Sequence, residues 1–171
     1  VNMNHFMVSP WEFTTMLRFN LRRIFLGQKK IEKALVAYKK SFQLKKSNRA
    51  LFIIVDLLRG LKKDSEAIAF LKEQLITSGD DESIHLKLAS IYQQINKQDD
   101  AITHYQKLLS INPSNTVALN NLAWIFVQQD NADGLVLAKK AFEIASGNVV
   151  IVDTYGYALI KQGYYKEGLK V

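Results

Sequence analysis

Apolar residues recur at intervals of three and four along most of the chain, and short polar breaks separate these runs. In residues 84–95 the apolar or small side chains fall on one side of a helix, and a second such run covers residues 101–109. The break at residues 96–99 contains an asparagine, which tolerates a left-handed backbone, and an acidic residue that can cap the next helix. Pro113 disfavours a helical backbone at the residue before it. The pattern predicts two packed helices joined by a short turn.

The same pattern predicts helices before this pair. The Ser-Pro-Trp-Glu sequence at residues 9–12 is a capping-box helix start, and the helix is expected to run to about residue 26. Residues 27–30 are expected to form a turn. A partner helix should then cover residues 31–44, with Tyr38 on its inner side.

Two ladders of equivalent positions define a longer period. Small residues open the second helix of each predicted pair, and apolar residues lie inside the first helix; both recur every 33 or 34 residues. The first ladder is Ala34, Ala67, Ala101, Gly134 and Gly168, and the second is Leu21, Ile54, Leu88, Leu122 and Tyr155. Amphipathicity alone explains the short period but not this one. The predicted units are an irregular lead at residues 1–8, repeats at 9–47, 48–81, 82–115 and 116–148, and a truncated fifth repeat at 149–171.

Residues 82–115 resemble a tetratricopeptide repeat (TPR), because Leu88-Ala89, Tyr92, Ala101, Tyr105 and Pro113 occupy the positions that the motif prescribes. The resemblance implies an all-α fold, a right-handed α-α superhelix of helix-turn-helix repeats. The residues assigned to packing within and between repeats are Ala34, Tyr38, Ala67, Leu88, Ala89, Tyr92, Ala101, Tyr105, Pro113, Leu122, Ala123, Phe126 and Gly156. Because each repeat covers its neighbour, the unfinished last helix is expected to leave an apolar face that a second copy covers.

The resemblance also implies that the first helices line a concave groove that holds a peptide or protein segment. By register, the groove residues are Phe19, Arg23, Phe52, Asp56, Arg59, Leu86, Ser90, Gln93, Asn120, Trp124, Gln128, Asp153, Tyr157 and Lys161. This set lacks the paired lysines and asparagines of the carboxylate-clamp subclass. It favours a peptide with apolar side chains instead. A second interpretation of Trp124 and Tyr157 stays open, in which they fill space between adjacent repeats.

A finer resemblance concerns residues 120–126, 137–146 and 153–163, which are similar to the C-terminal region of TPR lipoproteins of bacterial exosortase and exopolysaccharide export systems. That resemblance implies a periplasmic scaffold tethered to a membrane through an upstream lipid-bearing cysteine. The alternative compartment is the cytoplasm. Because the sequence opens on Val1 without a cleavable leader, we expect it to be an internal fragment of a longer protein.

Charge is distributed unevenly: the net charge is +7, with +11 on residues 1–63 and −4 on residues 64–171. Solvated helix surfaces explain such lysines without any ligand. The alternative is a polyanion site, for nucleic acid or an acidic polysaccharide, although nucleic acid is the less favoured partner. Its residues would be Arg18, Arg22, Arg23, Lys29, Lys30, Lys33, Lys39 and Lys40.

Catalytic and metal-binding motifs are missing from the sequence. There is no cysteine, no phosphate-binding loop and no H-E-x-x-H motif. His85 and His104 lie on the two helices of one repeat without neighbouring ligands in sequence, so a packing or surface role is expected rather than a metal site. No apolar run is long enough to span a bilayer. We therefore expect no cofactor and no enzyme, unless a catalytic domain lies outside these residues.

Overall fold

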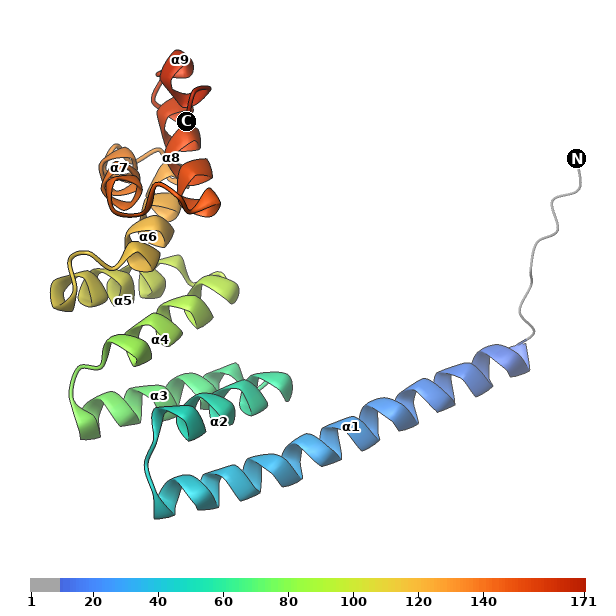
Figure 1. Ribbon diagram of the computed structural model, residues 1–171. Helices are drawn as coiled ribbons and strands as arrows, with labels where there is room; N and C mark the ends of the chain where they lie inside the picture. Colours follow the sequence, from blue (N-terminus) through green and yellow to red (C-terminus); the bar gives the residue numbers. More distant parts are fainter. Residues whose placement is uncertain (1–9) are drawn as a thin grey trace, which may run out of the picture. The chain divides into compact units, whose positions relative to one another are not determined.

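The computed structural model describes the backbone of residues 10–171 and the side chains from residue 26 onward. This part of the chain contains helices and no strand, which confirms the all-α prediction (Figure 1). The chain forms two compact units, residues up to Phe70 and residues from Leu71, and the boundary falls inside α3 (Asp64–Ser78). None of the helices described here is both long and apolar enough to cross a membrane.

The first unit contains α1 (Pro10–Leu44), α2 (Asn48–Gly60) and the start of α3. The predicted turn at residues 27–30 is wrong, because α1 is one helix of 35 residues. A glycine inside a helix costs only about 1 kcal/mol relative to alanine, and the residues that follow Gly27 are good helix formers without a proline. The first predicted helix pair is therefore a single long helix.

The C-terminal part of α1 packs against α2 through Leu35 and Phe42, which are buried. Phe42 also meets the ring of Phe70 edge to face, with 5.5 Å between ring centroids. The predicted inward position of Tyr38 is wrong, because this side chain is exposed, whereas Ala34 is half-buried. No preceding helix folds back within α1, so the surface that such a helix would cover on Tyr38 stays open to solvent.

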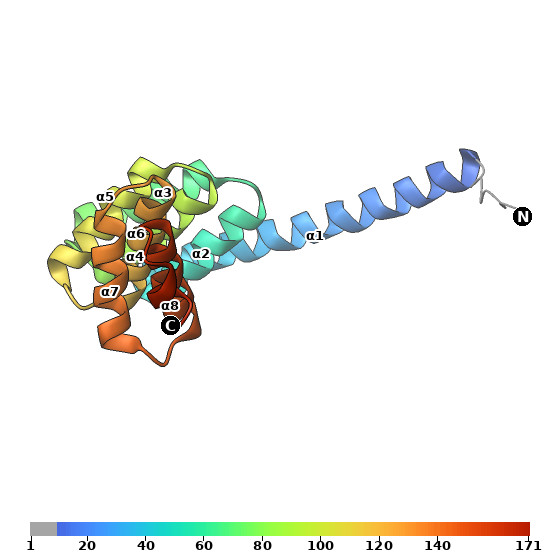
Figure 2. The ribbon, with the colours of Figure 1, turned by 90° about the horizontal axis from the view of Figure 1, so that it is seen from above.

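The second unit consists of the end of α3 and six further helices. They are α4 (Glu82–Gln94), α5 (Gln98–Ile111), α6 (Thr116–Gln128), α7 (Asp133–Ala145), α8 (Val149–Lys161) and the single turn α9 (Tyr165–Gly168). Each of α4 to α8 packs against the next helix in the chain, and α6 also packs directly against α8 (Figures 1 and 2). The unit is therefore a solenoid of helix pairs, in which α6 and α8, the first helices of two successive pairs, are neighbours.

Local sequence signals set the ends of these helices. The first helices of three successive pairs begin after Asp81, Asn115 and Asn148, whose side chains accept hydrogen bonds from backbone amides of the first turn. The turns after α4 and α6 contain Asn96 and Asp130 in the left-handed conformation, with φ of 60° and 52°. These short turns fold the second helix of each pair back on the first.

Close helix contacts explain the ladder of small residues. A Cβ atom on Gly134 would lie 2.7 Å from the backbone nitrogen of Val127, so α7 approaches α6 too closely for any side chain. Ala101 is fully buried where α5 approaches α4. A Cβ on Gly168 would lie 2.8 Å from the carbonyl oxygen of Gly156.

The remaining predicted packing positions divide by burial. The buried ones are Ala67, Leu88, Ala89, Tyr92, Tyr105, Leu122, Ala123 and Gly156, whereas Phe126 is half-buried. Pro113 is exposed, which makes its assignment to packing wrong. It follows the end of α5 at Ile111, where a proline stops a helix without needing any contact.

Candidate functional site

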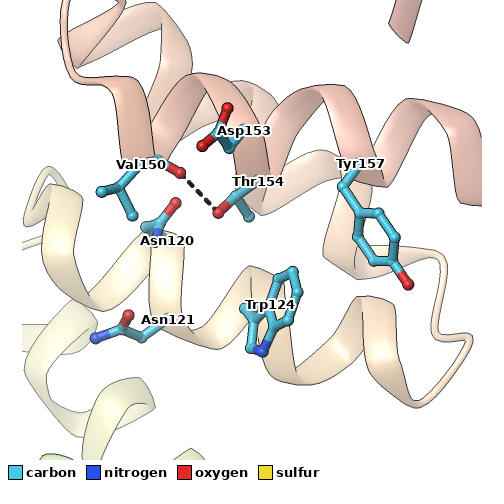
Figure 3. A pocket seen from close by; sticks show the side chains of 7 residues that line it. All are labelled: Asn120, Asn121, Trp124, Val150, Asp153, Thr154 and Tyr157. Atoms are coloured by element: carbon cyan, nitrogen blue, oxygen red, sulfur yellow. Dashed lines mark hydrogen bonds between the residues drawn. The ribbon is translucent and has the colours of Figure 1, made fainter.

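A cleft of about 390 Å³ lies between α6 and α8 (Figure 3). Its lining residues are Asn120, Asn121, Trp124, Val150, Asp153, Thr154 and Tyr157. Residues three, four and seven apart share one side of a helix, so α8 presents its four lining residues on a single face. The packing of α6 against α8 brings that face opposite the corresponding face of α6.

One end of the cleft is aromatic. The rings of Trp124 and Tyr157 lie 5.3 Å apart between centroids and are tilted by 37° to each other. Such a pair contributes about 0.5–1.5 kcal/mol beyond the area it buries. Trp124 nevertheless remains 41% exposed, so this contact between adjacent pairs leaves ring surface that a ligand can cover.

The other end of the cleft contains an amide oxygen without a partner. Asn120 is 7% exposed, and its Oδ1 atom accepts no hydrogen bond from the described residues. In Figure 3 this oxygen points from α6 toward α8. An unsatisfied buried acceptor costs about 1–3 kcal/mol, so an N–H donor placed here by a ligand would recover that energy.

The neighbouring amide, Asn121, is held in place by the preceding helix pair. Its Nδ2 donates to the Tyr105 hydroxyl on α5 at 3.0 Å, and this hydroxyl donates to Gln93 Oε1 on α4 at 2.9 Å. Tyr105 is completely buried, and burial raises the pKa of its hydroxyl while the bond from Asn121 opposes the shift. The network fixes the side of the cleft formed by α6.

Two further polar groups line the cleft from α8. The Thr154 hydroxyl donates to the carbonyl oxygen of Val150 at 2.9 Å, as the dashed line in Figure 3 shows. Its only hydrogen is therefore used inside α8, and its oxygen remains an acceptor. Asp153, one residue earlier, is exposed and is the only charged residue of the lining.

Four predicted groove residues thus line one cleft: Asn120, Trp124, Asp153 and Tyr157. The next predicted residues along the same helices, Gln128 and Lys161, are exposed but do not line it. Lys161 instead pairs with Asp130 at 2.9 Å, and this bond raises the pKa of its ammonium group.

The predicted groove residues of α4 are less available. Leu86, Ser90 and Gln93 are all half-buried. The Ser90 hydroxyl oxygen accepts a bond from Gln94, and Gln93 accepts the bond from Tyr105, so both side chains serve contacts within the protein.

The remaining predicted groove residues belong to the first unit. On α2, Phe52 is half-buried, Asp56 is exposed, and Arg59 is bonded to Asp64 through Nε at 2.9 Å. Phe19 and Arg23, with Arg18 and Arg22 of the predicted polyanion site, lie outside the residues whose side chains are described.

Sequence reasoning missed Asn121, Val150 and Thr154. On α6 and α8 the prediction advanced four residues at a time, whereas a helix face also includes positions three apart. Applied from Asp153 and Tyr157, that rule would have identified Val150 and Thr154. No sequence signal distinguished Asn121, because its role depends on a tyrosine sixteen positions earlier.

The two histidines of the α4–α5 helix pair, His85 and His104, are in contact. His85 is buried, and its Nδ1 lies 2.9 Å from Nδ1 of His104, whose ring stacks on Tyr92 at 5.6 Å. His85 Nε2 lies 3.2 Å from Oδ1 of Asp80, which also pairs with Lys107 at 2.6 Å. Because a carboxylate only accepts, His85 Nε2 carries the proton, and in the neutral pair His104 Nδ1 donates to His85 Nδ1.

This arrangement favours the neutral form of the His104 imidazole. Burial, together with the nearby charges of His85 and Lys72, lowers the pKa of His104 to about 4. The bonds from Lys107 and His85 lower the pKa of Asp80. Within the described part of the chain, no three histidine, aspartate or glutamate side chains come together as metal ligands. The pair therefore joins α4 to α5.

Comparisons with known proteins agree with this architecture. Residues 82–115 match the family model of the tetratricopeptide repeat. Anaphase-promoting complex subunit 7 of Arabidopsis thaliana is 32% identical over 71 residues, which are 42% of this chain and 12% of that protein. The chain thus spans about an eighth of the length of that relative.

Solved structures share the fold. A tetratricopeptide repeat protein from Parabacteroides merdae ATCC 43184 superposes with a TM-score of 0.70 at 20% identity, over 86% of this chain and 60% of that one. YrrB, described as a TPR protein with an unusual peptide-binding site, gives a TM-score of 0.64 at 16% identity, over 88% and 79%.

These findings define the class of protein as an α-α repeat solenoid. Within that class, the fold is that of the tetratricopeptide repeat solenoids, and residues 82–115 match the repeat itself, as their sequence indicated. Proteins of this family are in general non-catalytic scaffolds for protein interactions.

Proposed function

We propose that this scaffold binds a peptide segment of a partner protein in the cleft between α6 and α8. The observation that supports the proposal is the unpartnered Oδ1 of buried Asn120, beside an aromatic pair with exposed ring surface. A peptide supplies what both features lack: N–H donors for the amide oxygen and side chains that cover the rings. The printed description of YrrB as peptide-binding is consistent with such a use of the fold.

The cleft also suits a peptide in its dimensions and rigidity. Its volume of about 390 Å³ falls in the range typical of small-ligand pockets, which one or two side chains can fill. The bond from Asn121 to Tyr105 holds one side of the cleft in place before a ligand arrives. A preformed site loses less conformational entropy on binding than a flexible one.

Selection of peptides from a random phage-displayed library on the whole chain tests this proposal. Enriched peptides should bind the chain in solution, and Trp124→Ala should weaken them about tenfold or more, because buried aromatic anchors dominate such interfaces. Val136→Ala is the matched control, since Val136 is exposed on α7 and does not line the cleft. Selected peptides that bind both variants and the original chain equally would refute the assignment to this cleft.

A finer proposal places the scaffold in a bacterial envelope, as part of an exopolysaccharide export system. It rests only on the sequence resemblance of residues 120–126, 137–146 and 153–163. Isolation of the full-length protein from its native cells tests it. Recovery in the soluble cytoplasmic fraction would contradict it.

A second candidate function is binding of a polyanion along α1. Lys29, Lys30, Lys33, Lys39 and Lys40 are all exposed, and none forms an ion pair with a described residue. Affinity for a fluorescent single-stranded DNA probe or for heparin should then fall steeply as salt rises, because bound counterions are released. Replacement of the five lysines by glutamine should abolish binding; binding that persists, or that ignores salt, would contradict this candidate.

A further inference from the structure

The polar end of the α6–α8 cleft offers acceptors and few donors. Asn120 Oδ1 is unpartnered, Asp153 contributes a carboxylate, and the Thr154 hydroxyl has given its hydrogen to Val150. Asn121 has used an amide hydrogen on the Tyr105 hydroxyl. A ligand group that fits this end must therefore bring several donors.

The charge of the cleft has one sign. Asp153 is the only charged residue among the seven that line it, and no lysine or arginine is present there. The nearest cation on α8 in sequence, Lys161, is paired with Asp130 outside the cleft. A cationic ligand gains a favourable interaction in this setting, whereas a carboxylate would face Asp153 and the Asn120 oxygen without a counter-charge.

Resting on the proposed peptide-binding function, we propose that the cleft recognises an arginine side chain of the partner peptide. The guanidinium group has five N–H donors in a plane and no acceptor, so it can bridge the separate acceptors of Asn120 and Asp153. The methylene stem of the arginine lies along Trp124 and Tyr157, whose rings form the opposite end of the cleft (Figure 3). A lysine ammonium is a single point charge, and it satisfies this pair of acceptors less completely.

Synthetic peptides test the inference. The probes are fluorescein-labelled, end-blocked heptapeptides with identical alanine-rich flanks and one central residue: arginine, citrulline, lysine, leucine or glutamate. Binding to the whole chain is measured by fluorescence anisotropy. Citrulline keeps the shape of arginine and removes its charge, so it should bind about tenfold or more weakly than arginine, since hydrogen bonds to charged groups are the stronger class. Lysine should fall between them, and glutamate should bind worst.

Two matched variants assign the preference to the cleft. Asp153→Asn should remove most of the difference between the arginine and citrulline probes, because the amide keeps the shape and loses the charge. Glu143→Gln makes the same change of charge on α7, where Glu143 is exposed and pairs with Lys139, and it should leave the difference unchanged. Circular dichroism verifies that both variants are folded.

The outcomes separate this inference from the proposed function. Equal binding of arginine and citrulline probes, or an arginine preference that survives Asp153→Asn, overturns the arginine assignment. If the leucine probe or phage-selected peptides still bind and lose affinity in Trp124→Ala, the proposal of peptide binding in the cleft stands without the arginine assignment. If no probe and no selected peptide binds, both proposals are overturned.

Discussion

Replacement of Gly134 by alanine should destabilise the chain although alanine is the better helix former. The added methyl carbon would lie 2.7 Å from the backbone nitrogen and 2.7 Å from a side-chain carbon of Val127, and 3.1 Å from the carbonyl oxygen of Ala123. Two of these three atoms belong to the backbone of α6, so no rotamer change relieves the overlap, and α7 must move away. Overpacking of this kind costs about 1–3 kcal/mol.

The gain in helix propensity offsets part of that cost. Alanine is favoured over glycine by about 1 kcal/mol in a helix interior, and by less here because Gly134 is the second residue of α7. We expect a net loss of about 1–2 kcal/mol in the free energy of unfolding. In a chain of this size that loss corresponds to a decrease in melting temperature of about 2–8 °C.

Urea unfolding, followed by circular dichroism, measures this loss. The control is Gly147→Ala, because a methyl group at Gly147 meets no atom within 4 Å. It should change stability by no more than about 0.5 kcal/mol in either direction. Equal stability of the two variants, or a more stable Gly134→Ala protein, would refute the close approach of α7 to α6.

Three further predictions concern other parts of the second unit. Burial lowers the pKa of His104 from 6.5 to about 4, so its neutral form stabilises the fold fully above pH 6.5, and this contribution is lost as the pH falls toward 4. Without screening, the loss of stability is at most about 3 kcal/mol, and screening of the partly exposed ring reduces it to on the order of 1–2 kcal/mol. His104→Phe should remove this contribution from the difference between stability curves measured at pH 7 and at pH 4. Tyr105→Phe should cost about 1–3 kcal/mol in urea unfolding, because two amide side chains lose their bonding partner, and an unchanged midpoint would contradict the network. The exposed side chains of Tyr165 and Leu169 at α9 predict association of this chain through its last helices, which light scattering over a wide concentration range would detect; a monomer throughout that range, or equal association after Leu169→Lys, would contradict it.

The sequence was sufficient for the fold class and for most helices of the second unit. Two periods were superimposed there, the 3.6-residue repeat of each helix and the longer repeat of the ladders, and both follow from burial. The caps at Asp81 and Asn115 mark helix starts because their side chains satisfy amides that no helix carbonyl can reach.

The two failed predictions in the first unit, at residues 27–30 and at Tyr38, share a physical cause. The sequence Gly27-Gln28-Lys29-Lys30 is compatible with a turn and with the interior of a long helix, and local propensity decides between them by only about 1 kcal/mol. The error at residues 27–30 led to the second error at Tyr38, whose inward position required a helix folded back upon α1. Both mistakes in the first unit thus followed from one ambiguous glycine.

The cleft was only partly foreseeable for a different reason. Register placed Asn120, Trp124, Asp153 and Tyr157 on the right helix faces, because register depends on helical geometry alone. Whether an amide is bonded or left without a partner depends on atoms from several helices. For that reason the contrast between unpartnered Asn120 and bonded Asn121 became visible only in three dimensions.

The hydroxyl of Tyr105 also determines how this cleft could be transplanted. A graft of α6 to α8 onto another solenoid would carry all seven lining residues but leave Asn121 without its anchor. A graft that keeps this anchor therefore begins at Glu82, a whole repeat upstream of the first residue that lines the cleft. A graft that begins at α6 would carry the lining side chains, but the side of the cleft formed by α6 would no longer be held in place.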